Sequence, residues 1–451
     1  MRAGIMVFAL LLAACGGQPV VTGGGAAGPG EFAATQSAAP TSAPSSALSG
    51  TIAQTPFGAL VREAVLTSPT AMSNSATLRS ATAGIDAARA DYRPKVSLGA
   101  EMDHTGTVLP ALTLSQLVYD GGQSRARLRA ARMRAEQQRE DQVAALSAET
   151  LSAFDAAISL RAARARVAEA RANLTAHERL YAMVSERTYA GVGSTVDEGS
   201  ADARLTAARS GLMEAEAAVT KATGDFRAAF GFAPPAQLPT IPDAPGFGRT
   251  DPARIIEASA QMRALRFAEQ QQREVIEEIR AQRTPRLSVS VTSALGQRTY
   301  GNDVQGGLGV QMPVSTGGQI KANLAAAEQE LAALQADQAA LRRQLMNALE
   351  NAMADLHSRK ARLANARAAV SAARNAFEMA RDQYTIGKVS VIRLLDTQKD
   401  LSAAELALIE VERETALDGY TILAVTGDIL AAVGVNNPRE ALPAQPVTDA
   451  G

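Results

Sequence analysis

The stretch VYDGGQ at residues 118–123 decides the fold, because it recurs as VSTGGQ at residues 314–319. Each copy places two glycines between an alternating apolar run and a long stretch rich in Ala, Arg, Glu and Gln. The two pairs, which lie 196 residues apart, are Gly121 with Gly122 and Gly317 with Gly318. Glycine adopts backbone conformations that other residues resist, so each pair is expected to mark the place where a strand becomes a helix almost coaxially.

The repetition extends well beyond the glycines. The same offset aligns ARVAEARA at 165–172 with ARLANARA at 361–368, and these are identical at six of eight positions. Before the glycine pairs the offset becomes 191, which a difference of five residues in one loop explains. The chain is therefore predicted to contain one structural unit twice, over 53–232 and 251–432.

Each glycine pair follows a predicted strand hairpin, at 95–118 in the first repeat and 286–314 in the second. In the first strand Val96 and Leu98 point to one face and Ser97 to the other, and the remaining strands alternate similarly. Such alternation also fits a half-exposed soluble sheet, but strands of about 9 to 11 residues have the length of tilted transmembrane strands. Four strands cannot close a barrel, so several chains are expected to share one.

Each glycine pair is followed by a predicted long helix and a returning helix. These helices are expected at 123–188 and 195–230 in the first repeat, and at 319–386 and 389–431 in the second. At 1.5 Å per residue each long helix would reach roughly 100 Å. Every seventh residue from Leu349 to Tyr384 is apolar, as it is from Leu160 to Tyr181. This heptad spacing predicts a left-handed coiled coil with the returning helix.

Short breaks separate the paired helices, with YAGVGST at 189–195 and YTIGKVS at 384–390. Their glycines permit the tight reversal that a coiled hairpin needs. A turn at the far end of a long arm is also a natural contact point for a partner. The predicted tip residues are Gly191, Gly193, Ser194, Gly387, Lys388 and Ser390.

The N-terminal stretch MRAGIMVFALLLAAC has the layout of a secretory signal, and its run is too short to span a bilayer. LAAC resembles the bacterial lipobox, which makes Cys15 the expected lipidation site, although an ordinary signal peptide with an incidental cysteine is the alternative. Residues 1–15 are thus predicted to be a lipoprotein signal. A flexible linker over 16–52, a Pro-rich connector over 233–250 and a disordered tail over 433–451 complete the expected organisation.

Composition argues against several function classes. Formal net charge is -1, so no global field favours nucleic acid. The single cysteine leaves no multi-cysteine metal site, and no catalytic set or phosphate loop has a plausible context. No cofactor and no enzymatic activity are predicted. His104, His177 and His357 lack ligand spacing and are expected on the surface.

The two hairpins, the glycine steps, the coiled arms and the connector together resemble the TolC family of bacterial outer-membrane export channels, over about 53–432. The resemblance implies a mainly α-helical fold with membrane β-structure. Three chains would supply four strands each to a twelve-stranded barrel, continued by a periplasmic α-barrel. It implies a homotrimer in the outer membrane, contact with outer-membrane lipid, a periplasmic adaptor and an inner-membrane pump of RND or ABC type.

The resemblance also assigns a gate near the second tip. Asp396 matches the second of two acidic positions that some members carry three residues apart, but Arg393 occupies the first. A doubly acidic ring is therefore not expected, and ion pairs between Arg393 and Asp396 of neighbouring chains are the hypothesis, with solvated surface charges as the alternative. Asp197 is the candidate from the first tip. Lys95, Arg286 and Arg298 are the cations expected to anchor at the membrane interface.

The leading function is a passive exit duct of a tripartite export system, for efflux or for type I protein secretion. The alternative from another class is a lipid-anchored periplasmic coiled-coil scaffold or adaptor. An adaptor would be expected to carry a small β-rich domain between its helical halves, and a scaffold has no need of four membrane-length strands.

Overall fold

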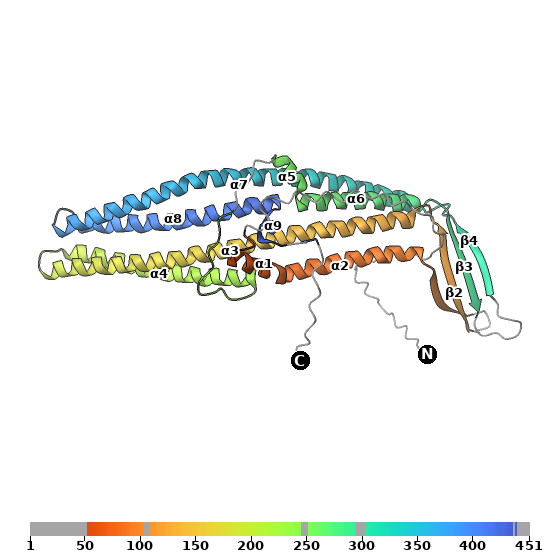
Figure 1. Ribbon diagram of the computed structural model, residues 1–451, viewed down its shortest axis with the longest axis horizontal. Helices are drawn as coiled ribbons and strands as arrows, with labels where there is room; N and C mark the ends of the chain where they lie inside the picture. The colour runs from red at the N-terminus through yellow and green to blue at the C-terminus, as the bar shows by residue number, and fades with distance from the viewer. Residues whose placement is uncertain (1–51, 103–107, 245–250, 295–303, 436–437, 440–451) are drawn as a thin grey trace, which may run out of the picture. The chain divides into compact units, whose positions relative to one another are not determined.

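The computed structural model describes residues 52–102, 108–244, 251–294, 304–435 and 438–439. The described chain divides into two compact units. The sheet unit consists of Ala83–Ala131 and Gln272–Gln329, and the helical unit contains the rest. The prediction of a mainly helical fold with a duplicated strand hairpin is confirmed (Figure 1).

The sheet unit contains one antiparallel sheet in the order β1-β2-β3-β4. Its strands are β1 (Lys95–Met102), β2 (Val108–Tyr119), β3 (Arg286–Ala294) and β4 (Val304–Gln311). The two hairpins are joined because β2 pairs with β3, a contact that the repeat alone did not predict. The second hairpin ends at Gln311 rather than at residue 314 as expected.

Cross-strand pairing separates the sheet into an apolar and a polar face. Val96 lies opposite Leu114, and Val289 lies opposite Leu308. The apolar face is uncovered within the chain, since Leu308 is 65% exposed and Leu98 is 71% exposed. The other face carries Ser, Thr and Gly. A contiguous exposed apolar surface of this kind marks a contact with a partner or a membrane.

The long helices reproduce the offset of 196 at every end. They are α3 (Gln123–Tyr189), α4 (Thr195–Phe230), α7 (Gln319–Thr385) and α8 (Val391–Thr426). The predicted heptad seam lies inward: Leu160 and Leu349 are fully buried, and Tyr384 is 7% exposed. One window of α3 is long and apolar enough to cross a membrane, but 56% of it is buried inside the chain, as in a core helix.

The expected returning helix at 389–431 is two helices, because Gly427 closes α8 in the left-handed conformation at φ 81°. Its N–H donates to the carbonyl of Ala424 at 3.2 Å, and α9 (Ile429–Val433) then begins. Gly231 closes α4 in the same way at φ 77°. Glycine is favoured at this position because it has no Cβ to clash.

The helices before each hairpin are also broken in two. They are α1 (Pro56–Thr67) and α2 (Pro69–Arg89), followed by the short η1 (Ala90–Tyr92), and α5 (Pro252–Ala258) and α6 (Ala260–Ala281). The breaks fall at Ser68 and Ser259, 191 residues apart, where the backbone is extended. Each serine hydroxyl accepts a backbone N–H three residues later and so caps the next helix.

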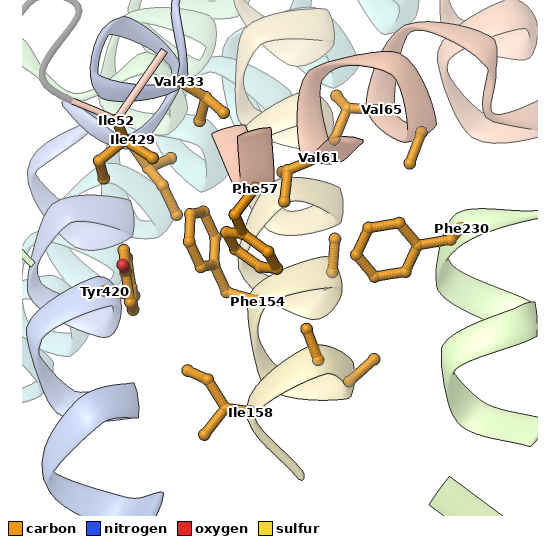
Figure 2. Close-up of a cluster of buried hydrophobic side chains, with 14 of the residues drawn as sticks. Ile52, Phe57, Val61, Val65, Phe154, Ile158, Phe230, Tyr420, Ile429 and Val433 are labelled. Carbon is orange, nitrogen blue, oxygen red and sulfur yellow. The ribbon is translucent and has the colours of Figure 1, made fainter. Parts of the chain in front are cut away.

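The core of the helical unit gathers aromatic side chains from distant parts of the chain, as Figure 2 shows. Phe154 of α3 stacks on Tyr420 of α8 with ring centroids 3.8 Å apart. Phe57 of α1 lies 5.3 Å from Phe154. Because these rings come from three helices, burying them fixes the N-terminal helix against both repeats.

Two predicted boundaries are wrong at this core. Ile52, assigned to the flexible linker 16–52, is 1% exposed, and Val433 and Val435, assigned to the tail 433–451, are 0% and 5% exposed. The N–H groups of Ile52 and Ala53 donate to the carbonyl of Ala432 at 3.2 and 3.0 Å. Isolated apolar residues in polar, Pro-rich sequence gave no periodic signal, although they close the core. The other residues assigned to the N-terminal signal and linker lie outside the described residues, as does most of the tail.

Candidate functional site at the steps and tips

The predicted strand-to-helix steps have the expected backbone. All four glycines lie in the left-handed region, with φ between 59° and 92°: Gly121, Gly122, Gly317 and Gly318. At the first step the Asp120 carboxylate accepts the N–H of Gly122 at 3.0 Å and of Ser124 at 2.7 Å. Asp120 therefore caps the N-terminus of α3 and complements its dipole.

The two steps differ in their surroundings. A Cβ added at Gly121 would lie 1.7 Å from the hydroxyl oxygen of Thr284, whereas one added at Gly317 would meet nothing within 4 Å. The Thr284 hydroxyl donates to the carbonyl of Ala281 at 2.6 Å and so cannot move freely. The first step is thus a close contact between β2 and the corner before β3, and the second is open.

The two tips are tight turns of the same design. Gly191 and Gly387 each have φ 75°, and Ser194 and Ser390 cap the helices that follow. A Cβ added at Gly193 would lie 2.7 Å from the backbone nitrogen of Thr188. In the second turn the N–H of Lys388 donates to the carbonyl of Gln383 at 2.8 Å, and its side chain is exposed. These contacts account for the six predicted tip residues as turn formers.

A small core joins the two tips inside the helical unit. Its members come from α3, α4, α7 and α8: Leu180, Val184, Ala201, Ala380, Tyr384, Val391, Leu394 and Leu395. Arg187 of α3 places its guanidinium 4.9 Å from the centre of the Tyr384 ring and donates to the Tyr384 carbonyl at 3.2 Å. Beyond this core, Tyr189 and Val196 are 96% and 72% exposed. The tips thus present apolar side chains to the outside.

The three predicted gate residues form no ion pair with one another among the described residues. The Asp396 carboxylate pairs with Arg204 of α4 at 3.1 Å, a contact between the two helical hairpins that sequence reasoning missed. Arg393 is exposed, and Asp197 lies half-buried in the first turn of α4. Asp396 therefore already has a cation from its own chain, with which any contact from a neighbouring chain must compete.

His177 was expected on the surface and is instead buried, at 5% exposure. Its Nδ1 has no hydrogen-bond partner among the described residues. Burial and the nearby Arg204 charge lower the pKa of His177. The imidazole is therefore neutral at pH 7 and packs as an apolar group beside the Arg204–Asp396 pair. His357 is exposed as expected, and His104 lies outside the described residues.

A pair of carboxyl groups lies farther along the two hairpins. Glu169 of α3 hydrogen bonds to Glu405 and to Ser402 of α8, and Arg374 of α7 pairs with Glu405 at 2.6 Å. Burial and the hydrogen bond with Glu405 raise the pKa of Glu169 to about 8. Glu169 is therefore protonated at neutral pH beside the Glu405 carboxyl.

A sequence profile of the outer membrane efflux protein family matches residues 60–231 and 252–428, which together make up most of the chain. The chain belongs to this family. The two matched segments correspond closely to the two repeats. The family is one of transport channels rather than of enzymes. Among curated protein sequences, none matches the chain significantly. The described residues contain no group of three or more His, Cys, Asp or Glu side chains that could hold a metal ion.

Solved structures of outer-membrane channels have the same fold. The channel OprN is 22% identical with a TM-score of 0.74, over 82% of this chain and 90% of its own. VceC of Vibrio cholerae is 18% identical with a TM-score of 0.73, over 82% of this chain and 96% of its own. The open-state MtrE channel of Neisseria gonorrhoeae is 17% identical with a TM-score of 0.72, over 83% and 89%. These efflux-family and TolC-like neighbours confirm the predicted resemblance.

Gly121→Ala is expected to destabilise the protein more than Gly317→Ala. Both changes force a Cβ into a left-handed conformation, which costs about 1 kcal/mol. Only the first also meets Thr284, which adds roughly 1 to 3 kcal/mol of overpacking. Thermal unfolding of the two variants measures the difference. Equal losses of stability would show that Thr284 yields freely.

Glu169→Gln is expected to flatten the pH dependence of stability. The pKa of Glu169 in the folded protein, about 8, lies above the ordinary value of 4.5. The protonated carboxyl therefore contributes its full stabilisation below about pH 4.5, and this stabilisation is lost as the pH rises to about 8. Discounted for solvent screening, the loss is about 1 to 2 kcal/mol. Unfolding at about pH 5.5 and about pH 9 tests this. The control Glu178→Gln, at an exposed position of α3, should keep the wild-type slope.

Proposed function

We propose that three copies of this chain form an outer-membrane channel that serves as the passive exit duct of a tripartite export system. The observation that carries the proposal is the exposed apolar face of the four-stranded sheet in a member of the efflux family. The face fits lipid, and the polar face of Ser, Thr and Gly fits a wetted lumen. The energy for transport would come from the inner-membrane partner.

The need of every backbone N–H and C=O group for a hydrogen bond favours a barrel shared between several chains. β1 and β4 are the two edges of the sheet and pair with one neighbour each. In hydrocarbon every unpaired N–H or C=O costs several kcal/mol, so β1 of one chain must pair with β4 of the next until the barrel closes. Three chains with four strands each give the twelve strands that the family resemblance implies.

The helical unit would continue the duct in the periplasm, where its tips meet a periplasmic adaptor. The exposed apolar side chains at the tips, among them Tyr189 and Val196, support a protein contact there. The turn residues Gly191, Gly193, Ser194, Gly387, Lys388 and Ser390 would set the shape of that surface. Lipidation at Cys15 would anchor the chain to the outer membrane, and the pump would be of the RND or ABC class, for efflux or for type I secretion.

A lipid-anchored scaffold is the competing function, and a matched pair of variants on β3 separates the two. Val289 and Ser290 are neighbours that point to the apolar and polar faces. If the strands span a bilayer, Val289→Arg places a charge in lipid at a cost of about 2 to 4 kcal/mol, while Ser290→Arg faces water. The native mass of protein extracted from outer membranes in mild detergent should correspond to three chains for the wild type and for Ser290→Arg, but not for Val289→Arg. A scaffold would tolerate both variants and yield monomers.

For the gate we propose that Arg393, Asp396 and Asp197 narrow the periplasmic entrance. Arg393→Ala should raise single-channel conductance in planar bilayers, because it removes the exposed cation from each of three chains and any ion pair it makes. Arg209→Ala, an exposed change on α4, is the control and should leave conductance unchanged. Unchanged conductance for Arg393→Ala would remove this residue from the gate.

A further inference from the structure

One end of the sheet collects exposed cationic side chains. The antiparallel order brings the starts of β1 and β3 and the ends of β2 and β4 to the same end, where the helices attach. Four exposed residues at these attachments, here called the junction cations, are Arg93, Arg125, Arg283 and Lys321. Arg125 and Lys321 are the third residues of α3 and α7 and are related by the offset of 196. Both repeats therefore place cations at this level.

The charges of the junction cations are unpaired within the described chain. None of the four has an ion pair or side-chain hydrogen bond among the residues that the structure describes. The cations that the sequence suggested as interface anchors are engaged elsewhere: Lys95 pairs with Asp91 at 3.1 Å, and Arg286 donates to Gln123 at 2.6 Å. Arg298 lies outside the described residues. The expectation that these residues anchor the interface is therefore not supported.

Three acids of the sheet unit, Asp91, Asp120 and Glu278, are also occupied. Asp91 accepts from Arg127 at 3.2 Å as well as from Lys95, and Glu278 accepts from Arg127 at 2.5 Å. The Asp120 carboxylate caps α3. Because these carboxylates already have partners, the net charge presented at this end of the sheet is positive.

Amphipathic side chains lie at the same level as the junction cations. Tyr92, next to Arg93, is 46% exposed, and Tyr119 at the end of β2 is 56% exposed. Burial and the Asp120 charge raise the pKa of the Tyr92 phenol, and the Arg125 charge acts in the opposite direction. The apolar face starts directly beyond, with Val96 65% exposed. Tyrosines and cations at the edge of an apolar band are typical of the depth of lipid headgroups.

We propose that the junction cations bind the phosphate groups of anionic phospholipids of the phosphatidylglycerol type, whose acyl chains lie on the apolar face of the sheet. This proposal rests on the proposed function, since it requires the strands to cross a bilayer. Charge complementarity selects an anionic headgroup, and guanidinium groups bind phosphate in bidentate fashion. The adjoining apolar face selects a lipid over a free anion. Each cation near an anionic lipid surface strengthens binding roughly fivefold.

The chain contains no Trp, so one introduced Trp reports on the lipid beside it. Tyr92→Trp places the reporter at the junction, and Leu98→Trp places it on the apolar face. Each variant is reconstituted as the assembled channel in vesicles of phosphatidylcholine with brominated phosphatidylglycerol, or of phosphatidylglycerol with brominated phosphatidylcholine. With roughly fivefold from each of Arg93 and Arg125, we expect about 25-fold preference for the anionic lipid at Tyr92→Trp, and no preference at Leu98→Trp. Adding Arg93→Gln and Arg125→Gln should reduce the preference at the junction to about onefold.

The results of this experiment distinguish failure of the lipid site from failure of the proposed function. Equal quenching of Tyr92→Trp by both lipids, or a preference that survives the two arginine substitutions, would overturn the lipid site while Leu98→Trp still reported a bilayer. If neither brominated lipid quenches Leu98→Trp, the strands do not cross the membrane. That result would overturn the proposed function and the lipid site with it.

Discussion

The apolar face of the four-stranded sheet is the constraint on which the rest of the structure depends. Cross-strand pairs such as Val96 with Leu114 and Val289 with Leu308 place β-branched and leucine side chains together, and nothing in the described chain covers them. Water around such a face is unfavourable, so it needs lipid or protein. A sheet with two free edges in lipid must in turn find further strands. Under the proposed function, the small number of strands per chain would make association part of the fold.

The strand-to-helix steps connect the sheet directly to the long helices. At each step from strand to helix the chain passes through the left-handed region, which the glycine pairs adopt at φ 59° to 92°. At the first step Asp120 satisfies N–H groups that the helix leaves unpaired, while Thr284 closes the contact from the opposite side. The direction of α3 from the sheet is therefore fixed by packing as well as by backbone conformation.

The sequence predicted what depends on period and spacing. The offset of 196 predicts the positions of all four long helices, and the alternation of apolar and polar residues predicts both faces of the sheet. Both patterns can be recognised in the sequence alone, without knowledge of which segments pack together. The same offset could also have found Gly231 and Gly427, which end α4 and α8, and the offset of 191 could have found the breaks at Ser68 and Ser259.

Other features were beyond sequence reasoning because they depend on residues far apart in the chain. The partner of Asp396 is Arg204, 192 residues away, and no local pattern joins them. His177 is buried on α3 and lies near Arg204 of α4, which no local pattern joins to it. The closing of the core by Ile52 and Val433 likewise depends on the two ends of the described chain meeting, with hydrogen bonds to Ala432. Such pairings are set by tertiary structure, which overrides local preference.

The duplication also conceals a division of roles between the repeats. Leu146 and Phe154 of α3 are 1% and 0% exposed, while the residues 196 positions later in α7, Arg342 and Glu350, are exposed. The two helices have the same length and the same turns, but only α3 supplies side chains to the aromatic core around Phe154 and Tyr420, whereas α7 contributes Leu349 and Tyr384 to two other cores. Exchanging the equivalent residues would bury a charge in one helix and expose a large apolar ring in the other. The repeat therefore specifies the architecture, and the substitutions between its copies specify which long helix supplies the aromatic core.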